Sequence, residues 1–136
     1  MPHEKFPVEV LTPEGTVFDE EVEMISTKTA AGSIGILANH EPVLAMLDPT
    51  ELRLYKTESE IVRFAQAEGY MQVADSRVLI LVEEAHPAGE LDAGQLRERL
   101  QQAERDLEAA GEDTEKQRVA QRDKRRFEQF LSIAGG

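Results

Sequence analysis

The chain has 136 residues, enough for one globular domain or for one small domain with an appendage. Hydrophobic residues make up 40% of it, so a folded core is expected, and the lack of cysteine excludes disulfides, thiolate zinc sites and cysteine nucleophiles. A net charge of −12 argues against binding to nucleic acid or to anionic lipid.

No segment of the sequence has the character of a membrane span. The first residues lack the basic and then apolar run of a signal peptide. Apolar runs such as residues 34–37 and 78–82 are far shorter than the roughly 20 residues that cross a bilayer. We therefore expect a soluble protein that associates with a membrane only indirectly, through a partner.

The charge is unevenly distributed along the chain. Residues 1–88 carry six basic and sixteen acidic side chains, whereas residues 116–136 carry six basic and two acidic ones. A basic segment on an acidic protein is typical of a docking site for an acidic partner, but also of a solvated helix face. The charge pattern by itself leaves both interpretations open.

Short strands are the expected elements up to residue 84. Residues 8–12 predict a first strand, and residues 16–18 a short continuation after a Pro-Glu-Gly turn. Residues 21–26 alternate charged and apolar side chains, which predicts a single half-buried strand. The glycines of residues 32–35 predict a tight bend.

Two hairpins are expected next. Residues 52–55 and 61–64 flank one polar turn, and residues 69–73 and 77–82 flank another. Many short strands at close spacing, with no helical stretch between them, indicate an all-β sandwich or barrel.

A change of pattern follows at His86-Pro87-Ala88-Gly89, and we place the domain boundary there, dividing residues 1–86 from residues 87–136. Asp92 predicts the N-cap of a helix, with Gln95 three residues later in the manner of a capping box. Gly111 is expected to end this helix. Its apolar stripe consists of Leu96, Leu100, Ala103, Leu107 and Ala110.

A second helix is expected from Thr114, with Thr114 as its cap and Gln117 three residues later. Its apolar residues are Val119, Phe127, Phe130, Leu131 and Ala134, and Asp123 interrupts their stripe. The short link at residues 111–113 predicts two antiparallel neighbours. Two narrow stripes gain only a few kcal/mol from burial at roughly 25 cal/mol per Å², which predicts an element that can detach and reopen.

The sequence offers no constellation for catalysis. His3, His40 and His86 lack the i, i+4 spacing of a helical metal pair, and neither a phosphate-binding loop nor a nucleophile elbow occurs. His40 lies in a predicted loop, where functional residues are common, but a lone histidine is more often a turn or packing residue. We expect a non-catalytic protein without a metal; a small hydrolase that uses His40 with a carboxylate is the alternative.

Residues 32–43, GSIGILANHEPV, resemble the motif G-x-x-G-[I/V]-x-x-x-H-x-P-x of epsilon subunits of bacterial F-type ATP synthases. Residues 8–14 resemble the first strand and turn of that family, and residues 67–85 its later hairpin. Leu91 and Asp92 match the opening of its helical hairpin, so the resemblance covers nearly the whole chain. It implies a β-sandwich of about ten strands followed by a C-terminal α-helical hairpin.

The resemblance also implies a function. Such a chain is a non-catalytic subunit of the central stalk, the rotor that couples ion translocation to ATP synthesis at the cytoplasmic face of the bacterial plasma membrane. Its β-sandwich domain would bind the gamma subunit and rest on the ring of c subunits. The position of the motif implies that Ala31, His40 and Glu41 make the c-ring contact. No cofactor is implied.

In many relatives the C-terminal hairpin extends into the alpha/beta catalytic head and inhibits ATP hydrolysis. The resemblance therefore gives the basic segment a partner, the acidic residues of the beta subunit. The matching residues are Arg118, Arg122, Lys124, Arg125 and Arg126. A free-standing interaction adapter of the same architecture, with another partner, is the alternative function.

Some relatives bind ATP on the folded hairpin through the motif [I/L]-D-x-x-R-A. Leu91 and Asp92 fit it, but Gln95 replaces the arginine and Leu96 the alanine. Glutamine cannot supply the charge-assisted hydrogen bond that arginine gives to phosphate. The resemblance therefore implies at most a weak nucleotide site, whose residues would be Leu91, Asp92, Arg122 and Arg126.

Overall fold

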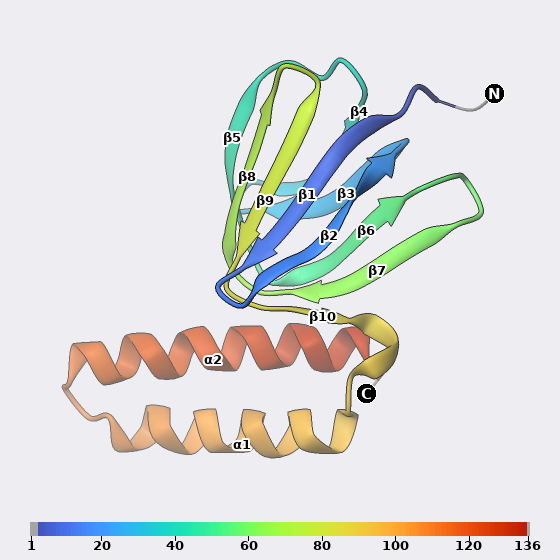
Figure 1. Ribbon diagram of the computed structural model, residues 1–136. Helices are drawn as coiled ribbons and strands as arrows, with labels where there is room; N and C mark the ends of the chain where they lie inside the picture. The colour runs from blue at the N-terminus through green and yellow to red at the C-terminus, as the bar shows by residue number, and fades with distance from the viewer. Residues whose placement is uncertain (1–2, 136) are drawn as a thin grey trace. The chain divides into compact units, whose positions relative to one another are not determined.

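The computed structural model describes residues 3–135 and contains two compact units that divide between Pro87 and Ala88 (Figure 1). The strands of the N-terminal unit are β1 (Phe6–Thr12), β2 (Gly15–Val22), β3 (Met24–Thr29), β4 (Gly32–Leu37), β5 (Val43–Leu47), β6 (Thr50–Tyr55), β7 (Ile61–Gln66), β8 (Gly69–Ala74), β9 (Arg77–Val82) and β10 (Ala85–Pro87). The C-terminal unit consists of a 3-10 turn (Ala88–Glu90) and the helices α1 (Ala93–Ala109) and α2 (Thr114–Ile133).

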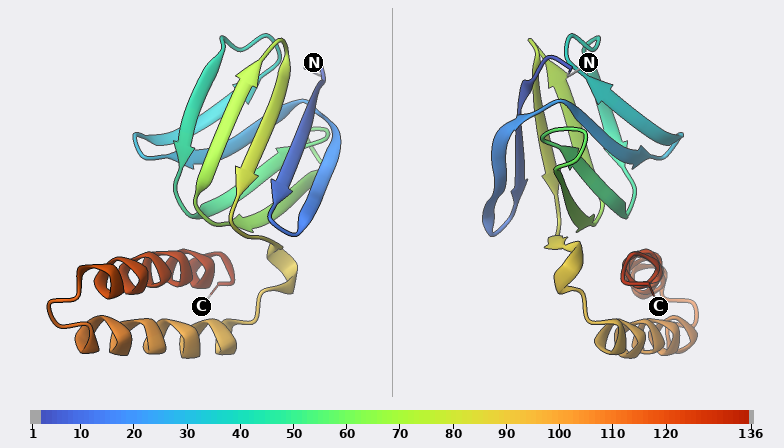
Figure 2. Two further views of the ribbon diagram at one scale, coloured as in Figure 1. Left: turned by 60° about the vertical axis from the view of Figure 1, so that its left-hand side comes forward. Right: turned by 90° about the vertical axis from the view of Figure 1, so that its right-hand side faces the viewer.

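The strands form a sandwich of two layers (Figure 2). One layer contains β10, β7, β6, β3 and β4, and the other contains β5, β8, β9, β1 and β2. Neighbouring strands are antiparallel except for β1 and β9, which run parallel. The expected ten-stranded β-sandwich followed by a helical hairpin is therefore confirmed.

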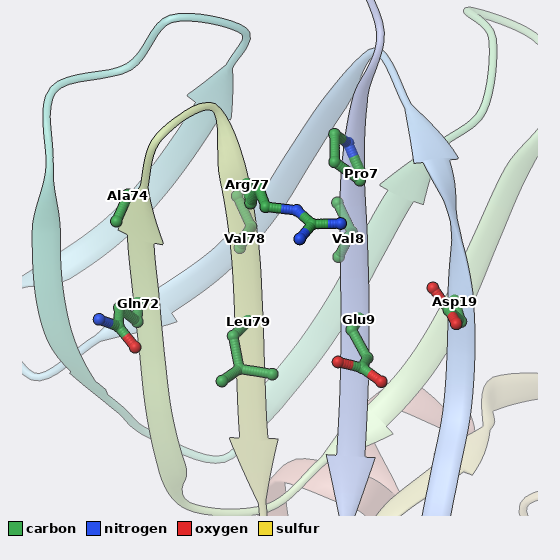
Figure 3. Close-up of a pocket in the computed structure, with 9 residues that line it drawn as sticks. All are labelled: Pro7, Val8, Glu9, Asp19, Gln72, Ala74, Arg77, Val78 and Leu79. Carbon is green, nitrogen blue, oxygen red and sulfur yellow. The ribbon is translucent and has the colours of Figure 1, made fainter.

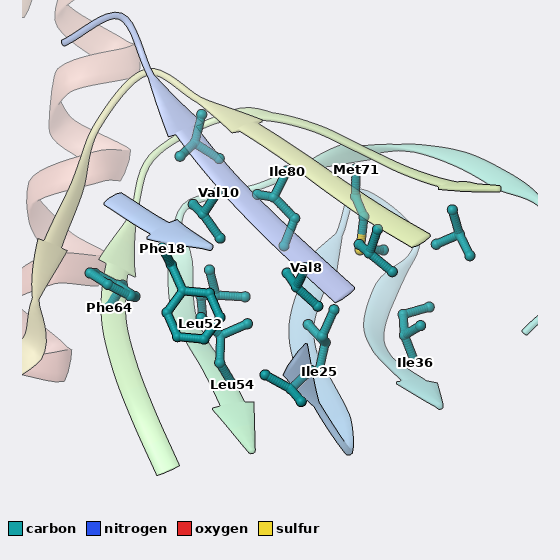
Figure 4. Packing of buried hydrophobic residues seen from close by; sticks show 14 of the residues in the cluster. Val8, Val10, Phe18, Ile25, Ile36, Leu52, Leu54, Phe64, Met71 and Ile80 are labelled. Atoms are coloured by element: carbon teal, nitrogen blue, oxygen red, sulfur yellow. The ribbon is translucent and has the colours of Figure 1, made fainter. Parts of the chain in front are cut away.

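Alternate residues of almost every strand point between the layers and form one apolar core (Figure 4). Val10, Ile25, Leu54, Met71 and Ile80 are fully buried in it. Successive side chains of a strand point to opposite faces of a sheet, which explains why apolar and polar residues alternate along these strands in the sequence. The two predicted hairpins are confirmed as β6–β7 and β8–β9.

The single strand expected at residues 21–26 is wrong. β2 ends at Val22 and β3 begins at Met24 in the other layer, so the chain changes layers at Glu23. Glu23 is buried, and its backbone N–H donates to the carbonyl oxygen of Tyr55 at 2.7 Å. The alternation continues through this point while the pairing partner changes, which is why periodicity alone did not separate the two strands.

The tight bend expected at residues 32–35 is also wrong. These residues belong to β4, which pairs with β3, and the reversal lies before them at Ala30 and Ala31. Gly32, the first residue after that turn, has a φ of +125°, in the region that favours glycine. Gly35 lies in ordinary strand geometry, where an added Cβ would be 3.8 Å from its nearest neighbour.

The helical unit is an antiparallel pair, as expected. Asp92 caps α1, since its Oδ1 accepts a hydrogen bond from the N–H of Gln95 at 3.0 Å, which confirms the predicted cap. The cap of α2 is Asp113 and not Thr114, because Asp113 Oδ1 accepts from the N–H of Lys116 at 3.0 Å. Both residues favour this position, and the structure selects the one a residue earlier.

Small side chains occupy several of the buried positions of the hairpin. Ala103 on α1, Ala110 at the C-cap of α1 and Ala120 on α2 are buried, as are Leu96 and Phe130. Leu100, Leu107 and Val119 are only half-buried. Gly111, at a φ of +56°, follows α1 and closes it in the left-handed conformation typical of helix ends. The alanines bring little apolar area into the pair, in agreement with the narrow stripes of the sequence.

Candidate functional site

The motif histidine lies in a polar loop between β4 and β5. His40 is half-buried, and its Nδ1–H donates to the carbonyl oxygen of Glu41 at 2.7 Å. Asn39, in the left-handed region at a φ of +63°, donates from Nδ2 to Glu4 Oε2 at 3.2 Å. These bonds hold the loop in a defined shape that leaves Glu41 exposed at one end of the sandwich.

Ala31 lies elsewhere, in the turn between β3 and β4. Its N–H donates to Thr29 Oγ1, and the Thr29 hydroxyl donates to the carbonyl oxygen of Gly32, both at 3.1 Å. The whole of β4 separates Ala31 from His40, about 20 Å at the rise of a strand. The structure thus brings His40 and Glu41 together but not Ala31, so the three expected contact residues do not form one patch.

A row of apolar side chains is exposed on the outer face of β5, β8 and β9. The exposed fractions are 72% for Leu44, 64% for Met46, 51% for Tyr70 and 44% for Leu81. Met46 pairs with Tyr70 and Tyr70 with Leu81 across the sheet, so these three stand side by side. We call the four residues the outer strip. Contiguous exposed apolar surface of this kind marks an interaction site.

The outer strip was not predicted from the sequence. β5 was missed altogether, because residues 43–47 are apolar on both faces and do not alternate. The available signal was the run Val-Leu-Ala-Met-Leu itself, bounded by Pro42 and Pro49, which is consistent with a strand whose second face is covered by something else.

A shallow groove continues the same face toward β1 and β2 (Figure 3). The Arg77 side chain reaches across toward β1, with Glu9 further along that strand and Asp19 on β2 (Figure 3). The lining residues are Pro7, Val8, Glu9, Asp19, Gln72, Ala74, Arg77, Val78 and Leu79. They include no histidine or hydroxyl nucleophile, so this surface suits contact with a partner rather than catalysis.

The basic residues of α2 differ in their exposure. Arg118 lies 2.6 Å from Glu115, and its hydrogen bond, followed by its charge, lowers the pKa of that carboxyl group. Arg122 lies 2.9 Å from Asp123. Arg118, Arg122 and Arg125 are exposed, Lys124 is half-buried and Arg126 is buried at 7% exposure. The five residues therefore do not present a single basic face.

The residues of the expected nucleotide site are also spread out. Asp92 uses one carboxylate oxygen to cap α1, and Leu91 beside it is half-buried. In an antiparallel pair the start of α1 is level with the end of α2, whereas Arg122 is near the middle of α2, about 15 Å away along the axis. Arg126 is closer to that level but buried.

The described residues supply no catalytic constellation. The bonded partner of His40 is a backbone carbonyl oxygen, so the carboxylate that the hydrolase alternative requires is not in place. His86 Nε2 lies 2.8 Å from Glu84 Oε1. Within residues 3–135 no group of three or more His, Asp or Glu side chains is arranged to hold a metal ion. No helix in that range is both long and apolar enough to span a membrane.

Comparison with known proteins agrees with this arrangement. Residues 5–88 match the protein family described as ATP synthase, Delta/Epsilon chain, beta-sandwich domain. The ATP synthase epsilon chain of Persephonella marina is 38% identical over 131 residues, which cover 96% of both chains. The chain belongs to the ATP synthase epsilon chain family. The epsilon chain of Rubrobacter xylanophilus is 40% identical over 98 residues, 72% of this chain and 66% of that protein.

Solved structures support the fold of this epsilon-family chain. A chain in the cryo-EM structure of the Euglena gracilis mitochondrial ATP synthase, OSCP/F1/c-ring, superimposes with a TM-score of 0.77 and 22% identity. The match covers 96% of this chain and 80% of that one. The family expected from the sequence is thus confirmed, and an epsilon chain is an accessory chain of a larger enzyme, not the catalytic one.

Proposed function

We propose that this epsilon-family chain is a rotor subunit of the central stalk of an F-type ATP synthase, where it helps to couple ion translocation to ATP synthesis. It acts as a peripheral subunit at the cytoplasmic face of the bacterial plasma membrane. Family membership supports the assembly, and the outer strip is the observation that carries the role. A chain of a multisubunit enzyme that exposes such a strip has a face prepared for a neighbouring subunit.

The gamma subunit is the proposed occupant of the outer strip. Fully burying a large apolar side chain contributes about 1.5–3 kcal/mol. Burial of all four residues would therefore supply several kcal/mol, which is enough to contribute substantially to docking. Tyr70 lies in the middle of its row, between Met46 and Leu81, where interface residues of this type contribute most to binding. The polar groove beside the strip would form the rim of the contact.

The ring of c subunits is the proposed partner of the loop that carries His40 and Glu41. The hydrogen bonds of this loop support a preformed contact, because little ordering is required on binding. Ala31 lies at the far end of β4. It would therefore contact a different part of the ring, or the gamma subunit.

The helical hairpin is the proposed regulatory element, which inhibits ATP hydrolysis when it enters the alpha/beta catalytic head. Exposed Arg118, Arg122 and Arg125 would be the first to meet acidic residues of the beta subunit. Buried Arg126 and half-buried Lys124 would join them only after the hairpin rearranges. The separation of Leu91 and Asp92 from Arg122 supports regulation without a tightly bound nucleotide.

Co-purification with gamma tests the rotor role. Met46→Lys and Tyr70→Ala should each weaken the complex at least tenfold, because they charge or remove the centre of the strip. Ile61→Lys is the matched control, since Ile61 is 40% exposed on β7 in the other layer. Equal loss in the control would show that the strip is not the docking face. Failure of the unaltered chain to retain any ATP synthase subunit would favour the free-standing adapter.

Truncation after Ala88 tests the regulatory role. The shortened chain should still bind gamma, and the assembled enzyme should hydrolyse ATP several-fold faster than the enzyme with the full chain. An unchanged hydrolysis rate would eliminate inhibition by the hairpin while leaving the rotor role intact.

A further inference from the structure

Gln66, the last residue of β7, has a fully buried side-chain amide. Its Nε2 donates to the carbonyl oxygens of Asp48 at 3.1 Å and of Ala67 at 3.0 Å. Its Oε1 accepts from the hydroxyl of Thr27 at 2.6 Å. One amide therefore joins β3, the connection between β5 and β6, and the connection between β7 and β8.

These contacts lie where the chain passes from one layer of the sandwich to the other. Along one edge of β3, Ser26 pairs with Arg53 of β6, whereas Thr29 pairs with Leu47 of β5. Between those pairs the ladder of β3 leaves one layer and joins the other, at Thr27. The corner is the name we give to residues 27, 48–49 and 66–67.

Two further crossings meet the corner. β7 ends where Gln66 pairs with Thr50, and β8 begins where Gly69 pairs with Leu47, so this connection also changes layers. The N–H of Ala67 donates to the carbonyl oxygen of Glu84, on the connection from β9 to β10, at 2.9 Å. Gln66 thus lies inside the region through which the two layers are tied together.

The chemistry of the corner matches an amide and no other side chain of that size. The position needs two N–H donors for two carbonyl oxygens and one acceptor for a hydroxyl group. Leucine would remove the bonds to two buried polar groups and one part-buried carbonyl oxygen, and a carboxylate would face two carbonyl oxygens as an acceptor. A purely space-filling role would not require these three bonds.

We propose that Gln66 is a positioning residue that fixes the two layers of the sandwich against each other. The outer strip lies on one layer and the β6–β7 hairpin lies on the other, so a rigid corner makes both move as one body. Together with the proposed rotor function, on which this part rests, the rigid corner allows torque to pass between surfaces on different layers.

Amide hydrogen exchange of the full chain tests the positioning role. The N–H of Asp48 donates to Lys28 at 3.1 Å and that of Ala30 to Met46 at 3.4 Å, so both report on the joint between β3 and β5. Gln66→Leu should speed their exchange by about tenfold more than that of amides in the β8–β9 hairpin, the effect of losing one or two net hydrogen bonds.

Val78→Ala is the control. It creates a cavity on the buried face of β9, remote from the hydrogen bonds of Gln66. This variant should accelerate amide exchange in general, with no larger effect at the Asp48 and Ala30 amides than in the β8–β9 hairpin. The same pattern in both variants would mean that Gln66 contributes only general stability, and would overturn the proposal.

Gln66→Glu tests the burial of this position and its two carbonyl oxygens together. The introduced carboxyl group would face two carbonyl oxygens, so its pKa in the folded chain should be raised above its value in the unfolded chain. Stability should then be greatest below the ordinary glutamate pKa and fall as pH rises through the raised value. If the difference in melting temperature between Gln66→Glu and the unaltered chain did not change with pH, the hydrogen-bonding role would be contradicted.

The assembled enzyme separates this inference from the rotor function. With Gln66→Leu, ion pumping per ATP hydrolysed should fall although gamma remains bound. Local loosening in hydrogen exchange with unchanged pumping would overturn the torque part of the proposal. Loss of gamma binding by the unaltered chain would instead count against the rotor function, and would leave the exchange result to decide on the corner.

Discussion

The β domain (residues 3–87) and the helical hairpin (residues 88–135) are stabilised by very different amounts of apolar surface. In the β domain the inward-facing side chains of both layers form one continuous cluster that includes phenylalanine, leucine, isoleucine and methionine. In the described part of the hairpin the buried apolar side chains are three alanines, Leu96 and Phe130, while Leu100 and Leu107 are only half-buried. The first unit has the core of an independent domain, and the second does not.

This difference teaches which unit is suited to transmit force and which to change state. The β domain resists deformation because its layers share a core and the hydrogen-bonded corner. The helices are closed at their ends by caps and a glycine turn, but few large apolar side chains are buried in the hairpin, so separating the helices should cost less than opening the sandwich. Rotor contacts are therefore expected on the first unit and regulation on the second.

Ile80→Ala should have the largest effect and tests the strong side of the comparison. Ile80 is fully buried on β9, and its truncation should lower the free energy of unfolding of the β domain by roughly 2–5 kcal/mol. Leu107→Ala in the hairpin should cost about 1 kcal/mol, because Leu107 is only half-buried. Urea unfolding followed by circular dichroism measures both, and equal losses would remove the contrast between the units.

Gly69→Ala tests the tightness of the β domain near the corner. A Cβ at this position would lie 1.9 Å from the carbonyl oxygen of Leu81 and 2.7 Å from Val82 Cα, both backbone atoms. The strands must shift, at a cost of about 1–3 kcal/mol. Gly35→Ala is the control, since its new Cβ would meet nothing closer than 3.8 Å. Similar melting temperatures for the two variants would contradict the close approach of β8 and β9.

Asp113→Ala sharpens the weak side of the comparison. Removing the cap of α2 should cost about 1 kcal/mol, because the N–H of Lys116 loses its acceptor. Loss of helical signal in circular dichroism at a lower temperature than in the unaltered chain is expected, with β-domain unfolding unchanged. Asp113→Asn should retain most of the helix stability that Asp113→Ala loses. A normal helical transition in Asp113→Ala would show that the cap does not limit the hairpin.

Glu115→Gln should have the smallest effect. Its carboxyl group is fully exposed, and the hydrogen bond from Arg118, followed by its charge, lowers its pKa. A lowered pKa means that the pair stabilises the helix above the ordinary glutamate pKa and loses this effect as pH falls through the lowered value. The unaltered chain and the variant should therefore differ slightly in helicity at pH 7 and converge in acid. A difference that grows in acid would reverse the sign and exclude this origin.

Much of the fold was predictable because it depends on local patterns. The β6–β7 and β8–β9 hairpins, the Asp92 cap and the Gly111 end of α1 were all expected from short segments. The cap of α2 was placed one residue late, since Asp113 and Thr114 both have the chemistry of a cap. Which of two adjacent candidates accepts the hydrogen bond depends on where the backbone turns, and composition does not fix that.

The candidate site was less predictable. That His40 and Glu41 contact the ring of c subunits stays a prediction from the motif. Ala31, placed beside them by its closeness in sequence, lies at the other end of β4. The outer strip combines residues of three strands, and only the pairing register places Met46, Tyr70 and Leu81 in one row. Gln66 gave no signal, because a single glutamine after an apolar strand is indistinguishable from a surface residue.

The sequence by itself determined the family, the two-part architecture and the lack of a catalytic constellation, because motif order, hydrophobic period and residue chemistry are properties of the linear chain. The tertiary structure decided which apolar side chains remain exposed and which polar one is buried at the crossing between layers. The physical reason is that both outcomes depend on contacts between strands far apart in the chain. Thr27 and Gln66 are 39 residues apart, and their hydrogen bond exists only once the two layers have packed.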